Sequence, residues 1–295
     1  MKKILLFTVF TGLGILFTIT SCTNNNKPQK TEFDSLSVKA EKTANGFGAT
    51  FSAPSPRELF ILFEDSDIKF NSELLPEPES YKNSLTTKSL NNSLGIYIAD
   101  IAYLNMFNQY GLMTSYLESV FNIADELDLT GIYNEFDFKK IFKNMDNMDS
   151  LEVLSDDLYL TITNFMTETD NEANLCLVYY SSYIELLYLV LSPMDEYDKN
   201  SPTLQHIAMQ GDGLKELYKY ASNFNDNPDI ESMLTDLAKI NKIWDSAETT
   251  KKATHVSKTD DGKMSIGGGV TYKHTKEQFI LLKHTVIDIR TKLIN

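Results

Sequence analysis

The chain has 295 residues, with 41 acidic side chains against 27 lysines and arginines, and its formal net charge at pH 7 is −14. A surface this acidic repels phosphate backbones and anionic lipid headgroups, which argues against nucleic acid as a partner. Only two cysteines are present, Cys22 and Cys176. A disulfide framework is therefore excluded as the main source of stability, and a packed core must provide it.

Residues 1–21 have the pattern of a signal peptide. Lys2 and Lys3 precede an apolar stretch of roughly 16 residues, which is shorter than the roughly 20 residues that a membrane-spanning helix needs. The sequence then turns polar at Thr23. Cleavage after Ser21 removes two lysines and no acid, which leaves 25 basic against 41 acidic residues and a charge of −16.

The sequence Ile19-Thr20-Ser21-Cys22 resembles the lipobox of bacterial lipoproteins. This resemblance implies cleavage between Ser21 and Cys22 and attachment of diacylglycerol and a further acyl chain, such as palmitate, to Cys22. Each buried CH₂ group contributes about 0.8 kcal/mol, so two or three chains would hold the protein firmly to a bilayer. The alternatives are an ordinary secretory signal, in which Cys22 is coincidental, and an uncleaved anchor.

Residues 22–53 are rich in Asn, Lys, Thr, Ser and Gly and are predicted to form a lipidated, flexible tether. About 30 such residues would reach roughly 30 Å. No acid lies between Thr23 and Lys30, whereas some exported lipoproteins carry acidic residues directly after the lipidated cysteine. The resemblance therefore implies the periplasmic face of the outer membrane, with the inner membrane as second choice.

Residues 54–295 show helical periodicity almost throughout. Helices are predicted over residues 55–64, 87–110, 113–127, 134–144, 150–168, 171–191, 203–224 and 228–246, and from a capping box at 275–278 to near the end. The first of these also has a capping box, formed by Ser55 and Glu58. A Pro-rich loop is expected at 75–78, a break at Gly111 and a soft point between Gly211 and Gly213.

The predicted fold class is all-α, an antiparallel multi-helix bundle with short connections. The segments 87–110 and 171–191 are apolar around most of their circumference, so each should be surrounded by other helices. Cys176 lies in the second of these segments and is expected to be a buried small hydrophobe. Residues 254–273 contain Asp-Asp-Gly and Gly267-Gly268-Gly269, a pattern that fits either a small β-hairpin or a long loop.

Three stretches of the body, SLGIYIADIAYLNMFNQY, YIELLYLVL and TKEQFILLKHTVIDIRTKLI, resemble an uncharacterised family of predominantly helical lipoproteins from Gram-negative bacteria. The resemblance spans much of the chain from about residue 54. Its motifs are hydrophobic and helical, so it implies the fold and the location without implying an activity.

Candidate site residues are polar groups in apolar surroundings. Asp100 and Glu185 lie within apolar helical stretches, and each is predicted to be buried with a partner or with a raised pKa. Arg290 is one of only two arginines in the chain, and we expect it to pair with Asp100 or Glu185. Their helical neighbours complete the candidate cluster: Tyr97, Tyr103 and Tyr188. The cluster is interpreted as a structural tie between helices, with a tyrosine-lined small-molecule pocket as the alternative.

No cofactor or metal is expected from the sequence. The four histidines include no pair at the spacing of three or four residues that a helical metal site needs. Two functions remain. The first is a binding or scaffold lipoprotein that contacts another envelope protein, and the second is a small-molecule-binding protein or enzyme that uses the carboxylate cluster.

Overall fold

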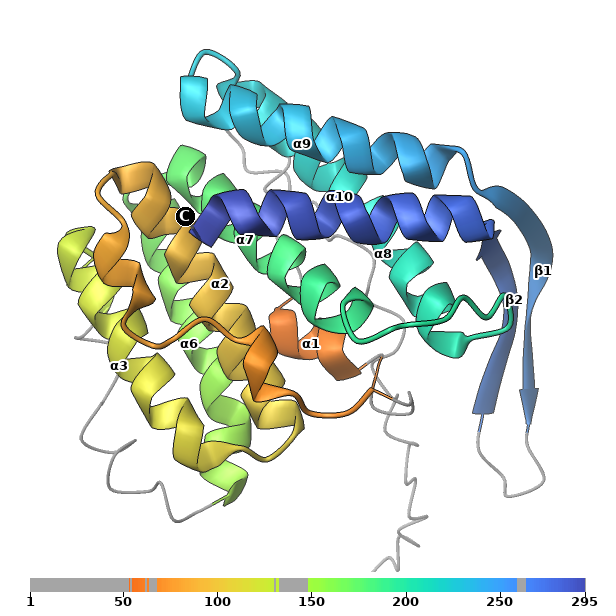
Figure 1. Ribbon diagram of the computed structural model, residues 1–295, viewed down its shortest axis with the longest axis horizontal. Helices are drawn as coiled ribbons and strands as arrows, with labels where there is room; N and C mark the ends of the chain where they lie inside the picture. The colour runs from red at the N-terminus through yellow and green to blue at the C-terminus, as the bar shows by residue number, and fades with distance from the viewer. Residues whose placement is uncertain are drawn as a thin grey trace, which may run out of the picture. The chain divides into compact units, whose positions relative to one another are not determined.

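The computed structural model describes residues 53, 55–61, 63, 68–129, 131–132, 148–258 and 264–294. These residues form helices that pack against one another and one two-stranded sheet, which confirms the all-α bundle (Figure 1). The expected signal peptide, the lipidation site Cys22 and the helix over 134–144 lie outside the described residues. So does the expected tether, apart from Ala53.

Two helices form the centre of the bundle. α2 (Thr87–Met106) and α7 (Glu172–Leu191) pack against each other along much of their length, and almost every residue of each is buried. α7 is long and apolar enough to cross a membrane, but 89% of its apolar window is buried inside the protein. It is therefore accounted for as a core helix, as its all-round apolar pattern predicted.

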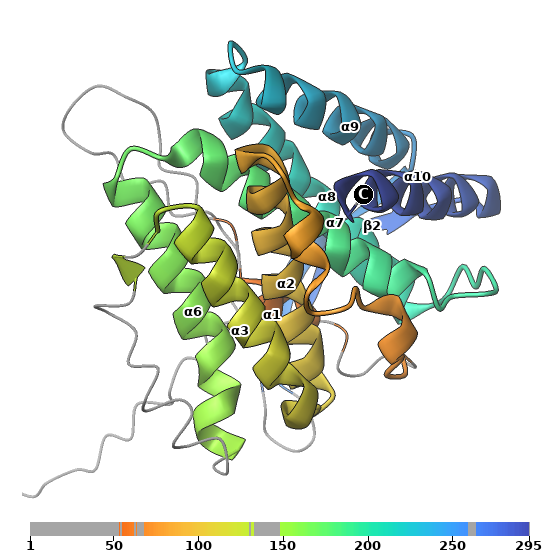
Figure 2. The same ribbon diagram turned by 60° about the vertical axis from the view of Figure 1, so that its left-hand side comes forward.

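The other helices surround this pair. α3 (Tyr110–Glu126) and α6 (Met148–Glu168) run beside α2 (Figure 2), and the short α1 (Pro56–Ile61) contacts α2, α6 and α7. α8 (Pro202–Ala221), α9 (Pro228–Asp245) and α10 (Lys276–Ile294) all pack on α7. α9 begins as predicted, with Asn227 as N-cap and Pro228 in the first turn. α8 begins in the same way, with Ser201 as N-cap and Pro202 in the first turn, one residue before the predicted start.

The break after α2 differs from the prediction. It lies at Asn108, which adopts a positive φ of 56°, while Gln109 N–H donates to the Leu104 carbonyl and closes the helix end. Gly111 lies in the first turn of α3. Asparagine tolerates the left-handed region because its short side chain makes local polar contacts, so the turn needs no glycine.

The soft point predicted in α8 is also wrong, because the helix runs unbroken past Gly211 and Gly213. A Cβ atom at Gly211 would lie 2.5 Å from the Trp244 ring, and one at Gly213 would lie 2.6 Å from the Tyr183 hydroxyl. Both glycines therefore make room for neighbouring side chains. The indole Nε1 of Trp244 donates to the Ala208 carbonyl in the same contact.

A β-hairpin, rather than a loop, connects α9 to α10. β1 (Glu248–Lys258) pairs antiparallel with β2 (Met264–Lys273), so the hairpin begins earlier than expected. The Tyr272 hydroxyl lies within 3.1 Å of the Asp212 carboxylate on α8 and ties β2 to the body. α10 then begins with the predicted capping box between Thr275 and Gln278.

Residues 68–84, which we call the strap, connect α1 to α2 across α2 and α3 (Figure 1). The strap contains two short 3₁₀ turns, Ser72–Leu74 and Ser80–Asn83, on either side of the predicted Pro-rich loop. Tyr81 is its one fully buried residue. The strap therefore lies on the surface of the bundle, where it covers the candidate site described next.

Candidate functional site

The structure brings Asp100, Glu185 and Arg290 together from the three helices α2, α7 and α10. Asp100 and Glu185 have no exposed surface, and Arg290 is 7% exposed. The Arg290 guanidinium pairs with Glu185, one of the two carboxylates predicted for it. The cluster therefore ties three helices together at the centre of the bundle.

Arg290 uses both its charge and its planar geometry. Its Nε donates to Glu185 Oε2 at 2.9 Å, and its Nη2 donates to Glu185 Oε1 at 3.2 Å, a two-pronged pairing. Nη2 also donates to the Leu74 carbonyl of the strap at 3.2 Å. The guanidinium lies over the Tyr188 ring, 4.4 Å from its centre, a cation–π contact that the predicted cluster includes.

Asp100 lies beside this ion pair without a donor of its own. Neither of its carboxylate oxygens receives a hydrogen bond from any described residue. Burial raises the pKa of Asp100 well above its ordinary value, the charge of Glu185 raises it further, and Arg290 partly opposes the shift. We therefore assign the proton of the carboxyl pair to Asp100, because burial and the charge of Glu185 both raise its pKa, whereas Glu185 has Arg290 as a direct partner.

Burial also raises the pKa of Glu185, but the charge and hydrogen bonds of Arg290 oppose that shift. For Arg290, burial alone would lower the pKa of the guanidinium, and Glu185 reverses this so that the pKa is raised. The cluster therefore consists of a neutral acid, a carboxylate and a guanidinium, with no net charge. Neutrality and internal hydrogen bonding are what allow such groups to be buried.

The tyrosines Tyr97 and Tyr103 point their hydroxyl groups at the strap. Tyr97 Oη donates to the Glu77 carbonyl at 2.8 Å, and Tyr103 Oη accepts a hydrogen bond from the Asn71 N–H at 3.0 Å. The strap therefore takes up the polar ends of the side chains that were expected to line a pocket. Tyr188, the third predicted tyrosine, contacts the Arg290 guanidinium directly, through the face of its ring.

Two residues that complete the arrangement are missing from the sequence prediction. Tyr116 and Ser119 of α3 donate to the carbonyls of Pro76 and Pro78 at 2.8 and 2.5 Å. Both lie one helical turn apart on the face of α3 that packs inward. Their spacing on one helix face was the sequence signal that could have identified them. Their partners are backbone carbonyls, which a sequence pattern does not distinguish.

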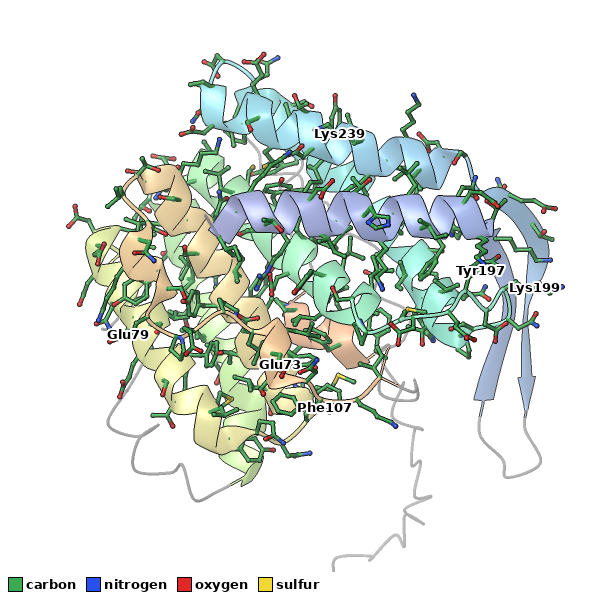
Figure 3. All side chains as sticks on the ribbon, in the orientation of Figure 1. Glu73, Glu79, Phe107, Tyr197, Lys199 and Lys239 are labelled. Carbon is green, nitrogen blue, oxygen red and sulfur yellow. The ribbon has the colours of Figure 1, made fainter. Side chains whose placement is uncertain are left out.

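A separate cleft of about 400 Å³ lies where the hairpin meets α10. Its lining includes Tyr197, Lys199, Ser246, Lys273, His274 and Gln278. Tyr197, labelled with Lys199 in Figure 3, donates its hydroxyl to the His274 carbonyl and packs on Phe279. Neither Asp100, Glu185 nor Arg290 lines this cleft.

Cys176 is fully buried in α7, as expected. Burial raises the pKa of its thiol to about 12, with a further contribution from the charge of Glu172. The thiolate is the reactive form of cysteine, so this thiol is unreactive at neutral pH.

Comparison of the chain with protein-family models, with curated protein sequences and with solved structures gave no match in any of the three.

Proposed function

We propose that this protein is a lipid-anchored lipoprotein whose helical body binds another component of the cell envelope. The lipobox-like sequence ending at Cys22 supports the anchor, and the absence of acids directly after it supports the periplasmic face of the outer membrane. The acidic composition supports a body that stands away from anionic headgroups on its tether.

The charged cluster is buried, and this observation supports a binding function over a catalytic one. Asp100 and Glu185 are fully buried, and Nε and Nη2 of Arg290 are bonded to Glu185 and Leu74. A catalytic carboxylate must reach its substrate within hydrogen-bond distance. A binding protein needs only a stable body and a surface, which this arrangement provides.

Fatty-acid labelling in a bacterial host tests the anchor. Cells grow with an alkyne-tagged palmitate analogue, and the wild type is compared with Cys22→Ser and with Cys176→Ala, a control that removes the other cysteine. We expect label and membrane association in the wild type and in C176A, and neither in C22S. Equal labelling of C22S would contradict the proposed anchor.

In-cell crosslinking of the native protein followed by mass spectrometry tests the binding role. We expect a crosslinked envelope protein that is recovered in a smaller amount when the Gly95→Ala substitution destabilises the body. Recovery of uncrosslinked monomer with a co-purifying small molecule would favour the second candidate function.

A further inference from the structure

Three hydroxyl groups of α2 and α3 donate to three consecutive carbonyls of the strap. Tyr116 Oη lies 2.8 Å from the Pro76 oxygen, and Tyr97 Oη lies 2.8 Å from the Glu77 oxygen. Ser119 Oγ lies 2.5 Å from the Pro78 oxygen and shares its proton with its own helix. We call Tyr97, Tyr116 and Ser119 the hydroxyl face. It contacts the segment Pro76-Glu77-Pro78 through the peptide backbone.

The chemistry of this contact is that of polyproline recognition. Leu75 has φ −83° and ψ 141°, close to polyproline II geometry, and it leads directly into Pro76. The two prolines have fixed φ angles and no N–H groups, so they present carbonyls without leaving a donor unsatisfied. Domains that bind Pro-rich peptides likewise use aromatic-lined surfaces for a preformed extended backbone.

Residues 72–80, the part of the strap around the prolines, are suited to opening. None of them is fully buried, and Leu74 and Leu75 are the apolar side chains among them that pack against the core. Ile68, Phe70 and Tyr81 pack there on either side and hold the ends of the strap. Glu73 and Glu79, both labelled in Figure 3, are exposed. Segments with few buried apolar contacts open locally at a small fraction of the free energy of global unfolding.

We propose that the strap is an internal ligand and that, when it opens, the hydroxyl face binds an extended, proline-containing segment of another envelope protein. This inference rests on the proposed binding function and names the chemistry of the partner. The hydroxyl face donates hydrogen bonds to backbone carbonyls. A partner segment can therefore accept the same hydrogen bonds with an equivalent backbone even if its side chains differ. Arg290, which donates to the Leu74 carbonyl, would hold the carbonyl of the residue two positions before the first proline.

Peptide binding to the full chain in detergent tests the proposal. The probe is a fluorescent peptide with the sequence SELLPEPES, which is that of residues 72–80, and the readout is anisotropy. Leu74→Ser/Leu75→Ser loosens the strap without changing the hydroxyl face. We expect this variant to bind the peptide at least about tenfold more tightly than the wild type, since the internal ligand no longer competes. The single variant L75S replaces the double one if the latter does not fold.

Two controls define specificity. Adding Tyr97→Phe and Tyr116→Phe to the loosened strap is expected to weaken peptide binding about tenfold, as is replacing both prolines of the peptide with alanine. A folded, loosened variant that does not bind, or that binds equally after the tyrosine changes, would overturn the proposal. Dimerisation of the loosened variant on sedimentation would show a second copy as the occupant and would overturn the choice of partner.

The two experiments distinguish an error in the proposed binding site from an error in the proposed binding function. If crosslinking in cells captures an envelope protein while the peptide does not bind, the function stands and the partner contacts another surface.

Discussion

Glu185 and Arg290 lie 105 residues apart in the chain, yet Arg290 Nε donates to Glu185 Oε2 at 2.9 Å inside the protein. Asp100 lies next to the pair and contributes a proton rather than a second charge, because burial and Glu185 raise its pKa. The two central helices, α2 and α7, and the neighbouring α10 are thereby joined by polar groups that are buried. Buried ion pairs of this kind are weak evidence for net stability, but breaking one is costly.

The raised pKa of Asp100 makes stability depend on pH. The native protein retains a proton that the unfolded chain releases near pH 4, so the free energy of unfolding falls as the pH rises from about 4 towards the folded-state pKa. The fall is up to about 1.4 kcal/mol per pH unit for one proton. Asp100→Asn keeps a neutral donor and should flatten the slope. Burial raises the pKa of Glu185 as well, so part of the slope should remain.

Urea unfolding across this pH range measures the slope. Asp226→Asn is the matched control, since Asp226 is exposed and its replacement should leave the slope unchanged. If D100N and D226N gave the wild-type slope alike, the assignment of the proton to Asp100 would be wrong.

Gly95 sets the distance between α2 and α7. A Cβ atom at this position would lie 2.1 Å from Ser181 Oγ and 2.3 Å from the Val178 carbonyl oxygen. Gly95→Ala therefore forces the two central helices apart and should lower the free energy of unfolding by about 3 kcal/mol or more. Circular dichroism during chemical unfolding measures the loss.

Gly111→Ala is the matched control for Gly95→Ala. Nothing lies within 4 Å of a Cβ atom at Gly111, which is in a helix, so this change should be neutral or stabilise the protein by up to about 1 kcal/mol. Equal effects of the two substitutions would contradict the close crossing of α2 and α7.

The hydroxyl face should control how often the strap opens. Tyr97→Phe and Tyr116→Phe each remove a hydrogen bond to a strap carbonyl, worth about 1 kcal/mol. Tryptic cleavage after Lys69 and Lys82 should then be about fivefold faster for each variant. Tyr110→Phe is the control, because the Tyr110 hydroxyl bonds to Asn108 rather than to the strap. Strap cleavage that does not respond to Y97F or Y116F would mean that these contacts do not hold it.

The sequence predicted the features that depend on periodicity and local signals. The caps at Asn227 and Thr275 follow from short-range patterns, and the central position of α2 and α7 follows from their all-round apolar composition. The Glu185–Arg290 pair was among the predicted partnerships because arginine is scarce and Arg290 lies on an apolar stripe.

What the sequence missed depends on three-dimensional neighbours. The turn at Asn108 needs the left-handed backbone conformation, which both asparagine and glycine adopt. The prediction considered only the glycine and therefore placed the break at Gly111. Gly211 and Gly213 were interpreted as flexible because their packing partners, Trp244 and Tyr183, are distant in the chain. The roles of Tyr116 and Ser119 depend on hydrogen bonds to backbone carbonyls of the strap. Every residue has a backbone carbonyl, so no sequence pattern identifies these partners.

The central claim is that the Asp100–Glu185–Arg290 cluster is a buried structural tie, and a double-mutant cycle on Glu185 and Arg290 tests it most directly. Glu185→Leu and Arg290→Met should each lower the free energy of unfolding by about 3 to 5 kcal/mol, because each leaves a buried charge without its partner. The double variant E185L/R290M should recover most of that loss. If all three variants unfolded within about 1 kcal/mol of the wild type, the range of an exposed pair, the tie would not exist.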